Sequence, residues 1–343
     1  MNFTSWNHRS IDATDSADNP RSASLRQSVE RISLSAFAFL TQPGFLGAPA
    51  ATPHATYAVA GIAWDGATTN RPGARMAPRS IRAASQMLCD GTHPFFGVSP
   101  LPQLGDCGDL LLPNTSLERM RAALPGQVDP LLRRHHMAWL GGDHSITLPL
   151  LQAYTRWLGR PLAVLHFDAH CDTWDSHFGE PSGHGTWVSE AMAQGLVVEP
   201  CFVQVGIRSA AERSARNFVT DRGGAVFTAR QLRGLDGPEQ LAGVVKAIRS
   251  RLAAHGNPPL YLSLDIDCLD PAFAPGTGTP EPGGLATSQV LTLLEELADL
   301  PFVGMDCVEV SPPYDHAELS SHAAAVLVWT YLCGRVAAAG KLA

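Results

Sequence analysis

Residues 161–174 read PLAVLHFDAHCDTW, and this stretch decides the fold. It begins with an apolar run and then places an aspartate or a histidine at every second position. A run that is apolar throughout is typical of a strand buried on both faces, as in a parallel sheet between two layers of helices. In open sheets of this kind, ligands bind beyond the carboxyl ends of the strands. The stretch therefore predicts a buried parallel strand whose end carries a polar site.

Similar short apolar runs recur along the chain and alternate with helix-like segments. The expected strands are 57–63, 136–140, 161–167, 201–207, 260–266 and 302–310, and the expected helices are 78–88, 116–132, 145–158, 190–195, 239–255, 288–300 and 319–338. This alternation predicts an α/β fold of three layers, α/β/α, in a single domain over residues 56–343. Residues 1–55 have weak periodicity and many Ser, Asp, Pro and Ala residues, so we expect an irregular N-terminal arm there.

The composition excludes several classes of protein. The 343 residues include 25 Lys and Arg against 32 Asp and Glu, which gives a net charge of −7. Charged residues make up 17% and hydrophobic residues 45% of the chain, whereas ordinary soluble domains are nearer a quarter charged. A disordered acidic chain would have fewer apolar residues, and a nucleic-acid binder would need a basic surface. We therefore expect a large buried core, buried subunit contacts and no nucleic-acid partner.

The cysteines and the apolar runs indicate a cytoplasmic protein. The seven cysteines are far apart and form no CxxC pair, which favours reduced thiols over a disulfide framework or a zinc ribbon. The polar N-terminus carries three aspartates before its first apolar run, which is not the pattern of a signal peptide. The apolar run at 323–332 is shorter than the roughly 18 residues that a membrane span requires, so we expect a buried helix and no membrane partner.

Three motifs place Asp and His residues directly after expected strands: GGDHSIT at 141–147, FDAHCDTW at 167–174 and SLDIDCLDP at 263–271. Alternate side chains of an extended chain share a face, so the motifs bring together His144, Asp168, His170, Asp172, Asp265 and Asp267. Four carboxylates at one mouth repel unless cations neutralise them. Two divalent ions that share a carboxylate fit the number of ligands, and oxygen and imidazole donors suit Mn²⁺ and permit Ni²⁺, Co²⁺ or Zn²⁺. Such a pair of ions can activate water.

Other polar residues in these motifs have structural interpretations. A role in a turn or in support of a neighbouring ligand is expected for Asp143 and for Asp270, which precedes a proline. His166 is interpreted as a core histidine. Cys171 and Cys268 occupy the alternate positions of their motifs, so we expect them to be small packing residues.

The motifs, in this order, resemble those of the ureohydrolase family, which includes arginase, agmatinase and guanidinobutyrase. The run from Asp265 to Gly284 matches the family pattern almost throughout, and the resemblance covers roughly residues 60–332. It implies an arginase-like fold with a central, mostly parallel eight-stranded sheet, so that 56–343 is a ureohydrolase catalytic domain. It also implies two divalent metal ions, Mn²⁺ by family default with Ni²⁺ as the main alternative. By resemblance, one ion is held by His144, Asp168, Asp172 and Asp265, and the other by His170, Asp168, Asp265 and Asp267.

The resemblance also implies catalytic roles for three residues. Asp267 would stabilise the tetrahedral intermediate. His184, in the SGHGT segment 182–186, would carry a proton to the departing amine, which leaves poorly unless it is protonated. Glu309, in the segment 305–313, would pair with the guanidinium group, because a fixed carboxylate holds a planar cation well. The structural alternatives are a surface-loop histidine and an ion pair at a strand end.

The expected reaction is the hydrolysis of a small guanidino compound to urea and an amine, and agmatinase-like activity is the default. The segment 173–181 lacks the arginase pattern, so arginine is disfavoured as the substrate. Trp174 and Trp187 are expected to line the substrate pocket, and the loop 65–70 is expected to close over it together with the N-terminal arm. The alternative substrates are guanidine, alkylguanidines or biguanides such as metformin, hydrolysed with Ni²⁺. Family resemblance implies a homo-oligomer, a trimer or a hexamer, and a hetero-oligomer with a paralogue stays open.

A dinuclear phosphoesterase and a non-catalytic subunit are alternative classes of function. A dinuclear phosphoesterase also uses Asp and His motifs, but its usual motifs and their order are absent from this sequence. A non-catalytic paralogue subunit of a ureohydrolase complex is the second alternative. The complete set of six family ligands disfavours it.

Overall fold

The computed structural model describes residues 44–176 and 178–341, which fold around one eight-stranded sheet. The strands are β1 (Tyr57–Gly61), β2 (Leu104–Asp109), β3 (His136–Leu140), β4 (Leu162–Phe167), β5 (Val197–Val205), β6 (Ala225–Phe227), β7 (Leu260–Asp265) and β8 (Phe302–Val308). Every neighbouring pair is parallel, and the order across the sheet is β2-β1-β3-β8-β7-β4-β5-β6. The expected parallel sheet is therefore confirmed.

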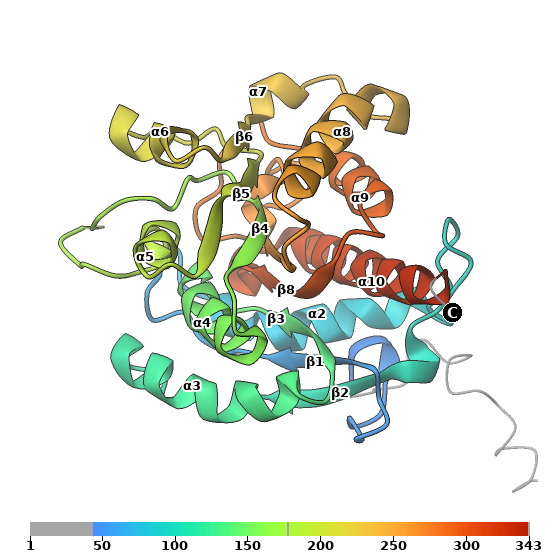
Figure 1. The fold of residues 1–343 in the computed structure, drawn as a ribbon. Helices are drawn as coiled ribbons and strands as arrows, with labels where there is room; N and C mark the ends of the chain where they lie inside the picture. The colour runs from blue at the N-terminus through green and yellow to red at the C-terminus, as the bar shows by residue number, and fades with distance from the viewer. Residues whose placement is uncertain (1–43, 177, 342–343) are drawn as a thin grey trace, which may run out of the picture.

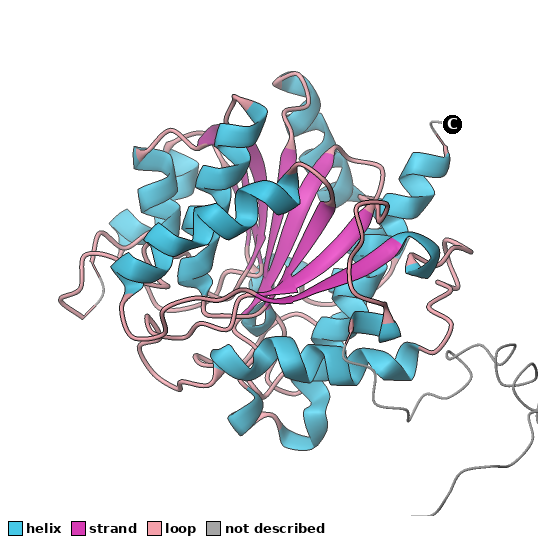
Figure 2. Ribbon diagram, turned by 90° about the horizontal axis from the view of Figure 1, so that it is seen from below, coloured by secondary structure: helices cyan, strands magenta, loops and turns pink. Residues whose placement is uncertain are grey.

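Helices cover both faces of the sheet (Figures 1 and 2). They are α2 (Ala77–Ser85), α3 (Leu117–Leu132), α4 (Thr147–Leu158), α5 (Trp187–Ala193), α6 (Arg213–Asp221), α7 (Ala229–Leu232), α8 (Pro238–Ala254), α9 (Thr287–Glu296) and α10 (Leu319–Gly340). Buried residues of α2, α8, α9 and α10 share one hydrophobic core, and those of α3, α4 and α5 share a second one. The sheet separates these cores, which confirms the three-layer α/β/α architecture.

The central strands are largely apolar because they contribute to both cores. In β1, Tyr57 and Val59 belong to one core, whereas Ala58 and Ala60 belong to the other. Alternate side chains of a strand point to opposite faces, so a strand covered on both sides carries no solvent-facing polar positions. This is the pattern from which the parallel sheet was predicted.

The sheet order brings the three motifs together. Strands β3, β8, β7 and β4 are consecutive neighbours in the middle of the sheet. The first motif follows β3, the second follows β4, and the third extends from the end of β7. Since all strands are parallel, their carboxyl ends meet at one edge, and the segment with Glu309 follows β8 at that same edge.

Several elements differ from the expectation. Strand β2 was not predicted because its sequence, LGDCGD, has two glycines and two aspartates in place of an apolar run. Strand β6 has only three residues, and α6 and α7 are short and were not predicted either. Helix α5 begins at Trp187, three residues before the expected start.

The described part of the expected N-terminal arm is packed against the domain. Phe45 is fully buried, and its backbone N–H donates to Asp106 Oδ2 (2.8 Å). Ala51 donates to the carbonyl of Asp106 (2.9 Å), which extends the edge of the sheet beyond β2. The packed domain therefore includes residues before the expected boundary at 55. The remainder of the arm, 1–43, lies outside the described residues.

Helix α10 and the cysteines agree with the sequence-based expectations. Within the described residues, α10 lies in the one segment long and apolar enough to cross a membrane, but most of that segment is buried, and α10 packs on α2 and α9. We conclude that it is a core helix. All seven cysteines lie within the described residues, and none forms a disulfide.

Candidate metal centre and active site

Three aspartates organise the chain after β3, β4 and β7 in the same way. Asp143 Oδ1 accepts the backbone N–H of Ser145 (3.0 Å), and Asp168 Oδ1 accepts that of His170 (2.6 Å). Asp265 Oδ1 accepts that of Asp267 (2.8 Å). A side-chain bond to the backbone two residues on is an Asx turn, which favours a sharp bend. The side chains of each motif thus converge because the chain turns at the strand end, and not because it stays extended as we had expected.

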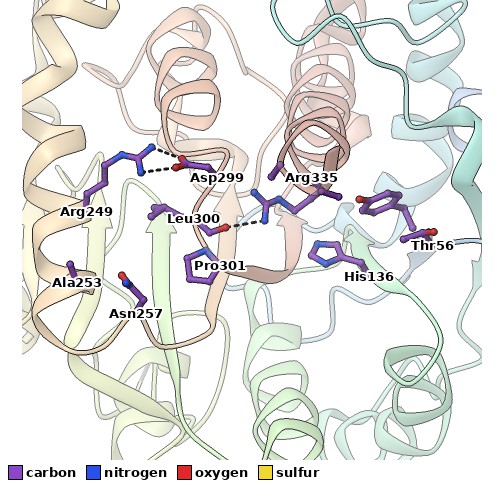
Figure 3. Close-up of a pocket in the computed structure, with 12 residues that line it drawn as sticks. Thr56, His136, Arg249, Ala253, Asn257, Asp299, Leu300, Pro301 and Arg335 are labelled. Carbon is purple, nitrogen blue, oxygen red and sulfur yellow. Dashed lines mark hydrogen bonds and ion pairs between the residues drawn. The ribbon is translucent and has the colours of Figure 1, made fainter. Parts of the chain in front are cut away.

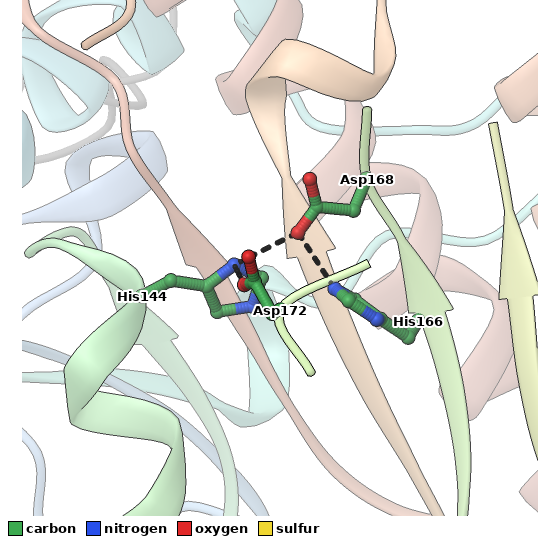
Figure 4. A group of neighbouring side chains, drawn as sticks. All are labelled: His144, His166, Asp168 and Asp172. Carbon is green, nitrogen blue, oxygen red and sulfur yellow. Dashed lines mark hydrogen bonds and ion pairs between the residues drawn. The ribbon is translucent and has the colours of Figure 1, made fainter. Parts of the chain in front are cut away.

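The first group of side chains surrounds one nitrogen of His144. Its Nδ1 lies 3.1 Å from Asp168 Oδ2, 3.2 Å from Asp172 Oδ2 and 3.1 Å from Asp265 Oδ2. Figure 4 shows His144, Asp168 and Asp172 pointing toward one another from separate segments. All four residues are buried. A single N–H cannot serve three carboxylates, so this arrangement favours a cation among them.

The other nitrogen of His144 fixes how the ring is protonated. Ser263 Oγ donates its only proton to Asp306 Oδ1 (2.8 Å), so it accepts a hydrogen bond from His144 Nε2 (2.8 Å). In the neutral ring, Nδ1 then carries a lone pair that faces the three carboxylates. Metal-binding histidines usually have such an acceptor at the other ring nitrogen, which sets their tautomer and orientation. His144 therefore has the surroundings expected of a metal ligand.

The second group is centred on His170. Its Nδ1 lies 3.0 Å from Asp267 Oδ2 and 3.4 Å from Asp168 Oδ1. Asp168 thus directs one oxygen at His144 and the other at His170. Such a carboxylate has the arrangement needed to bridge two cations. The spacing of ligand atoms is compatible with a metal ion at two overlapping sets of residues: His144, His166, Asp168 and Asp172, and Asp168, His170 and Asp267.

The pKa values reflect the crowding of negative charge. Burial, aided by the charge of Asp168, raises the pKa of Asp172 to about 8. Burial also raises the pKa of Asp265, to which the charges of Asp267 and Asp168 contribute. Burial opposes ionisation of Asp168 too, but His166 and the other neighbouring histidines hold its pKa well below the usual range. Divalent cations would allow all of these carboxylates to ionise together. The donor set of oxygens and imidazoles therefore fits the implied metal pair.

His166 is a buried core histidine, as expected, and it also contacts a candidate ligand. It is fully buried, as expected of a core residue, but its Nε2 lies 2.7 Å from Asp168 Oδ2. Gln204 donates from Nε2 to His166 Nδ1 (3.1 Å) and to the carbonyl of Cys171 (2.9 Å), so the proton of the neutral ring is on Nε2. Burial lowers the pKa of His166, which favours that neutral form. His166 thus donates to Asp168 and helps to orient it.

Trp187 is not part of an open substrate pocket, which corrects the expectation from the sequence. Its side chain is fully buried, and the ring packs 5.0 Å from His144 and 4.9 Å from His166 between centroids. The indole N–H donates to Asp172 Oδ2 (2.8 Å). Trp187 therefore helps to hold the candidate ligand Asp172 in place through this hydrogen bond. Trp174 is half-buried and packs on a small cluster that includes Cys171, so its contact with substrate stays a prediction.

His184 and Glu309 form a buried pair next to the first group. His184 Nδ1 donates to Glu309 Oε1 (3.0 Å), and that oxygen also accepts the backbone N–H of His144 (2.8 Å). Thr69 Oγ1 lies 2.8 Å from His184 Nε2. Burial alone would lower the pKa of His184, but Glu309 raises it to about 9. Glu309 Oε2 is buried and has no hydrogen-bond partner among the described residues.

The backbone is strained at two of these residues. Asp172 and Glu309 have φ angles of 53° and 63°, which lie in the left-handed region that non-glycine residues seldom occupy. Strain of this kind is concentrated at functional sites, where the surrounding structure enforces it. In Glu309 the reversal turns the side chain after β8 toward the two histidines.

Comparison with known proteins agrees with this geometry. A family model described as the arginase family matches residues 55–334. The chain belongs to the arginase family. It is 40% identical over 286 residues to an agmatinase of Chromobacterium violaceum, which covers 80% of this chain and 82% of that protein. It is accordingly an agmatinase-like ureohydrolase, a hydrolase that acts on carbon–nitrogen bonds of amidines.

Solved structures of arginase-family proteins have the same fold. Proclavaminate amidino hydrolase from Streptomyces clavuligerus superimposes with a TM-score of 0.79 at 35% identity, over 88% of this chain and 99% of that one. A hypothetical agmatinase from Burkholderia thailandensis also gives 0.79, at 34% identity, over 89% of this chain and 94% of that one. The arginase-like fold expected from the motifs is therefore confirmed.

The loop 65–70 of this arginase-family chain lies at the site, as expected. The backbone N–H of Ala67 donates to Asp143 Oδ2 (2.8 Å), and Thr69 contacts His184. Asn70 Nδ2 donates to the carbonyl of Gly278 (3.0 Å) on the opposite side. Asp143 thus supports a neighbouring loop. Asp270 accepts the backbone N–H of Ala272 in its own turn and those of Gly283 and Gly284 in the segment before α9, so both aspartates have the structural roles that were expected.

A network that the sequence did not indicate holds the segment that carries His184. Glu190 Oε1, on α5, accepts hydrogen bonds from Ser182 Oγ and Thr186 Oγ1, both at 2.7 Å. Arg121 of α3 donates from Nη1 to Ser182 Oγ (2.5 Å) and to Glu190 Oε2 (3.2 Å). The hydroxyl groups of Ser182 and Thr186, on either side of His184, could not be recognised as part of a network from the sequence, because the residues that bond them lie on α5 and α3.

Proposed function

We propose that this chain hydrolyses a guanidino compound with an amine-bearing tail to urea and the corresponding amine, as an agmatinase does. The proposal on substrate class is supported by the similarity to a protein named agmatinase over four-fifths of both chains. It is also consistent with the segment 173–181, which lacks the arginase pattern. The residues of the candidate site have the chemistry needed to bind a guanidinium group and to protonate a departing amine.

One observation carries the proposal. Glu309 Oε2 is buried and lacks a hydrogen-bond donor among the described residues, and hydrogen bonds to His184 and His144 hold its partner oxygen, Oε1. Burying an unpaired carboxylate oxygen is unfavourable unless a donor occupies the space before it during function. A Cβ atom added to Gly278 would lie 3.3 Å from that oxygen, so the glycine keeps this space open. A guanidinium ion offers planar, charged N–H donors to this unpaired oxygen.

The metal pair would be held by the two groups described above. We assign His144, Asp168, Asp172 and Asp265 to one cation, and His170, Asp168, Asp265 and Asp267 to the other. Two divalent cations there supply positive charge that lowers the pKa of a water molecule and stabilises charge developing on the substrate. Hard oxygen and imidazole donors suit Mn²⁺, and Ni²⁺ is the alternative.

The chain's own residues would position the substrate and move the proton. Glu309 would hold the guanidinium so that its central carbon faces the carboxylate groups. Asp267, whose Oδ1 accepts the backbone N–H of Ala169 (3.0 Å), would stabilise the tetrahedral intermediate. His184 has a raised pKa and would donate a proton to the amine as it departs. The buried surroundings of these groups strengthen each interaction.

The decisive experiment measures urea release from a panel of guanidino compounds. Agmatine, guanidinobutyrate, arginine, guanidine, dimethylguanidine and metformin are tested with the protein loaded separately with Mn²⁺ and Ni²⁺. We expect agmatine to give the highest kcat/KM. A clear preference for guanidine, an alkylguanidine or metformin would support the alternative substrate class, and it would overturn the agmatinase assignment.

Glu309→Gln provides the matched test of the site. It keeps the shape of the side chain and removes its charge, and we expect kcat/KM to fall by about 100-fold, which corresponds to the loss of about 3 kcal/mol from a charged hydrogen bond. Glu239→Gln, on an exposed position of α8, is the control and should retain full activity. No urea from any compound with either metal would refute the proposed activity. Equal activity of both variants would refute the role of Glu309.

We also propose that the chain forms a homo-oligomer, a trimer or a hexamer. The support is the low charged fraction of 17% and the family resemblance. Size-exclusion chromatography with light scattering measures the mass directly. A monomer of 36.6 kDa at assay concentration would contradict this proposal.

A further inference from the structure

A second cavity lies at the amino-terminal edge of the sheet, opposite the edge that carries the metal centre. Its volume is about 700 Å³, and it is lined by residues at the beginnings of β1, β3 and β8, before β7, and on α8 and α10. We call it the amino-edge cavity. Leu300, Pro301, Ala253, Ala338 and Ala339 form its apolar walls. A cavity of this size that combines apolar walls with polar groups is typical of a small-molecule site.

Among the described residues that line this cavity, Arg335 of α10 is the one cation without an ionic partner. Its side chain is 9% exposed, and Nη1 donates to the carbonyl of Leu300 (2.9 Å). Its Nε and Nη2 are buried and have no hydrogen-bond partner among the described residues. Figure 3 shows the guanidinium group between Leu300 and Pro301 on one side and His136 on the other. A buried guanidinium with unused N–H groups calls for an acceptor.

The other charged groups of the amino-edge cavity neutralise one another. Arg249 donates to both carboxylate oxygens of Asp299, at 3.1 and 2.5 Å. Burial, together with the charge of Arg335, lowers the pKa of His136 to about 3, so this imidazole is neutral. The cavity therefore carries one uncompensated positive charge. The guanidinium of Arg335 also packs 5.1 Å from the centroid of Phe302, which fixes it against an apolar surface.

We propose that the amino-edge cavity binds a small monoanionic carboxylate with a short hydrocarbon chain. A carboxylate matches the planar donors of Arg335 and supplies the single negative charge that the cavity lacks. The alanine and leucine walls accommodate the hydrocarbon part. Inorganic phosphate would bring more charge than one arginine neutralises and would leave the apolar walls uncovered. This site does not depend on the proposed hydrolase activity, because it shares none of the residues of the metal centre.

Butanoate is the probe that tests the proposal. Its binding to the metal-loaded wild-type protein is measured by isothermal titration calorimetry and by ligand-observed NMR, with butanamide, butylammonium and inorganic phosphate as comparisons. We expect saturable binding of butanoate that is at least tenfold tighter than that of the three comparison compounds. Equal binding of butanamide, or no saturable binding of butanoate, would overturn the proposal without the need for any variant.

Arg335→Met locates the binding, because it keeps much of the side-chain volume and removes the guanidinium. We expect at least a tenfold loss of butanoate affinity, with metal content and urea release unchanged. Arg156→Met, an exposed arginine of α4 that pairs with Asp129, is the control and should bind butanoate like the wild type. If Arg335→Met binds butanoate normally, the ligand lies elsewhere and the proposal is wrong. If that variant does not fold, a crystal structure of the wild-type protein with butanoate decides, and only ordered water on Arg335 would refute the site.

Discussion

Ser263→Ala tests whether the hydrogen bonds behind His144 determine metal affinity. Ser263 is fully buried in β7, accepts from His144 Nε2 and donates to Asp306 Oδ1, with both distances at 2.8 Å. Alanine removes both bonds and leaves a ring N–H and a carboxylate oxygen unpaired. It also removes the acceptor that holds the proton on Nε2. The ring is then free to carry its proton on Nδ1, and in that tautomer Nδ1 cannot bind a metal ion.

The magnitude follows from these two losses. Each buried polar group left without a partner costs about 1–3 kcal/mol of folding free energy. Removing the partner that orients a metal-binding histidine weakens metal affinity by about 10–100-fold. Ser263→Ala should therefore lower both the thermal midpoint and the affinity for Mn²⁺. Affinity is measured by competition with a chelator, followed by metal analysis of the protein.

Ser85→Ala is the matched control. Ser85 of α2 is also fully buried, and it accepts from the backbone of Leu46 (2.8 Å) and donates to the carbonyl of Arg82 (2.7 Å). Its loss should cost similar stability without any change in metal affinity. If Ser263→Ala loses stability like the control and retains wild-type affinity for Mn²⁺, the reasoning about the His144 tautomer is refuted.

Three further predictions concern the same site. Burial raises the pKa of Asp172 to about 8 in the metal-free protein, so at pH 6 the binding of a cation must displace its proton. The affinity for Mn²⁺, measured by calorimetry, should therefore rise between pH 6 and pH 8. A fall in affinity over this range would contradict the prediction. Trp187→Phe keeps an aromatic ring but deletes the N–H bonded to Asp172, so chelator competition should show about tenfold weaker Mn²⁺ binding, and unchanged binding would count against it. Glu190→Ala releases the segment that carries His184, so urea-release assays should show kcat reduced by about tenfold or more at unchanged metal content. The control is Glu199→Ala, at a half-buried glutamate that pairs with Arg222. Equal rates of the two variants would refute the role of the Glu190 network.

The central strands and the position of the site could be predicted because both leave local patterns in the sequence: buried strands are runs of apolar residues, and the site residues are Asp and His motifs. The six expected strands are apolar on both faces, and the motifs follow three of them directly. Strand β2 left no such pattern, since it lies at the edge of the sheet and carries Asp106 and Asp109, which pair with Arg82 of α2. Its identity as a strand depends on that long-range pairing.

The contact of His166 with Asp168 was missed from the sequence and Trp187 was misplaced, for different reasons. His166 stands two residues before Asp168, so the alternation used for the motif would have placed both side chains on one face. That signal was present in the sequence. The role of Trp187 depends on where α5 packs relative to His144, and no local sequence pattern contains that information. The reversed backbone at Glu309 is likewise imposed by its surroundings, since glutamate does not favour a positive φ.

The order of the strands has a consequence for how the protein matures. Strands β3 and β4 are synthesised early, but β8 and β7 lie between them in the sheet. With strands about 4.8 Å apart, β3 and β4 stand about 14 Å from each other, and the sheet has no continuous hydrogen bonding across that gap until the last strand is made. His144 and Asp168 therefore meet only after nearly the whole chain has left the ribosome. Nascent fragments would lack the complete candidate ion site, so any cations bound there would be acquired late in the biogenesis of this protein.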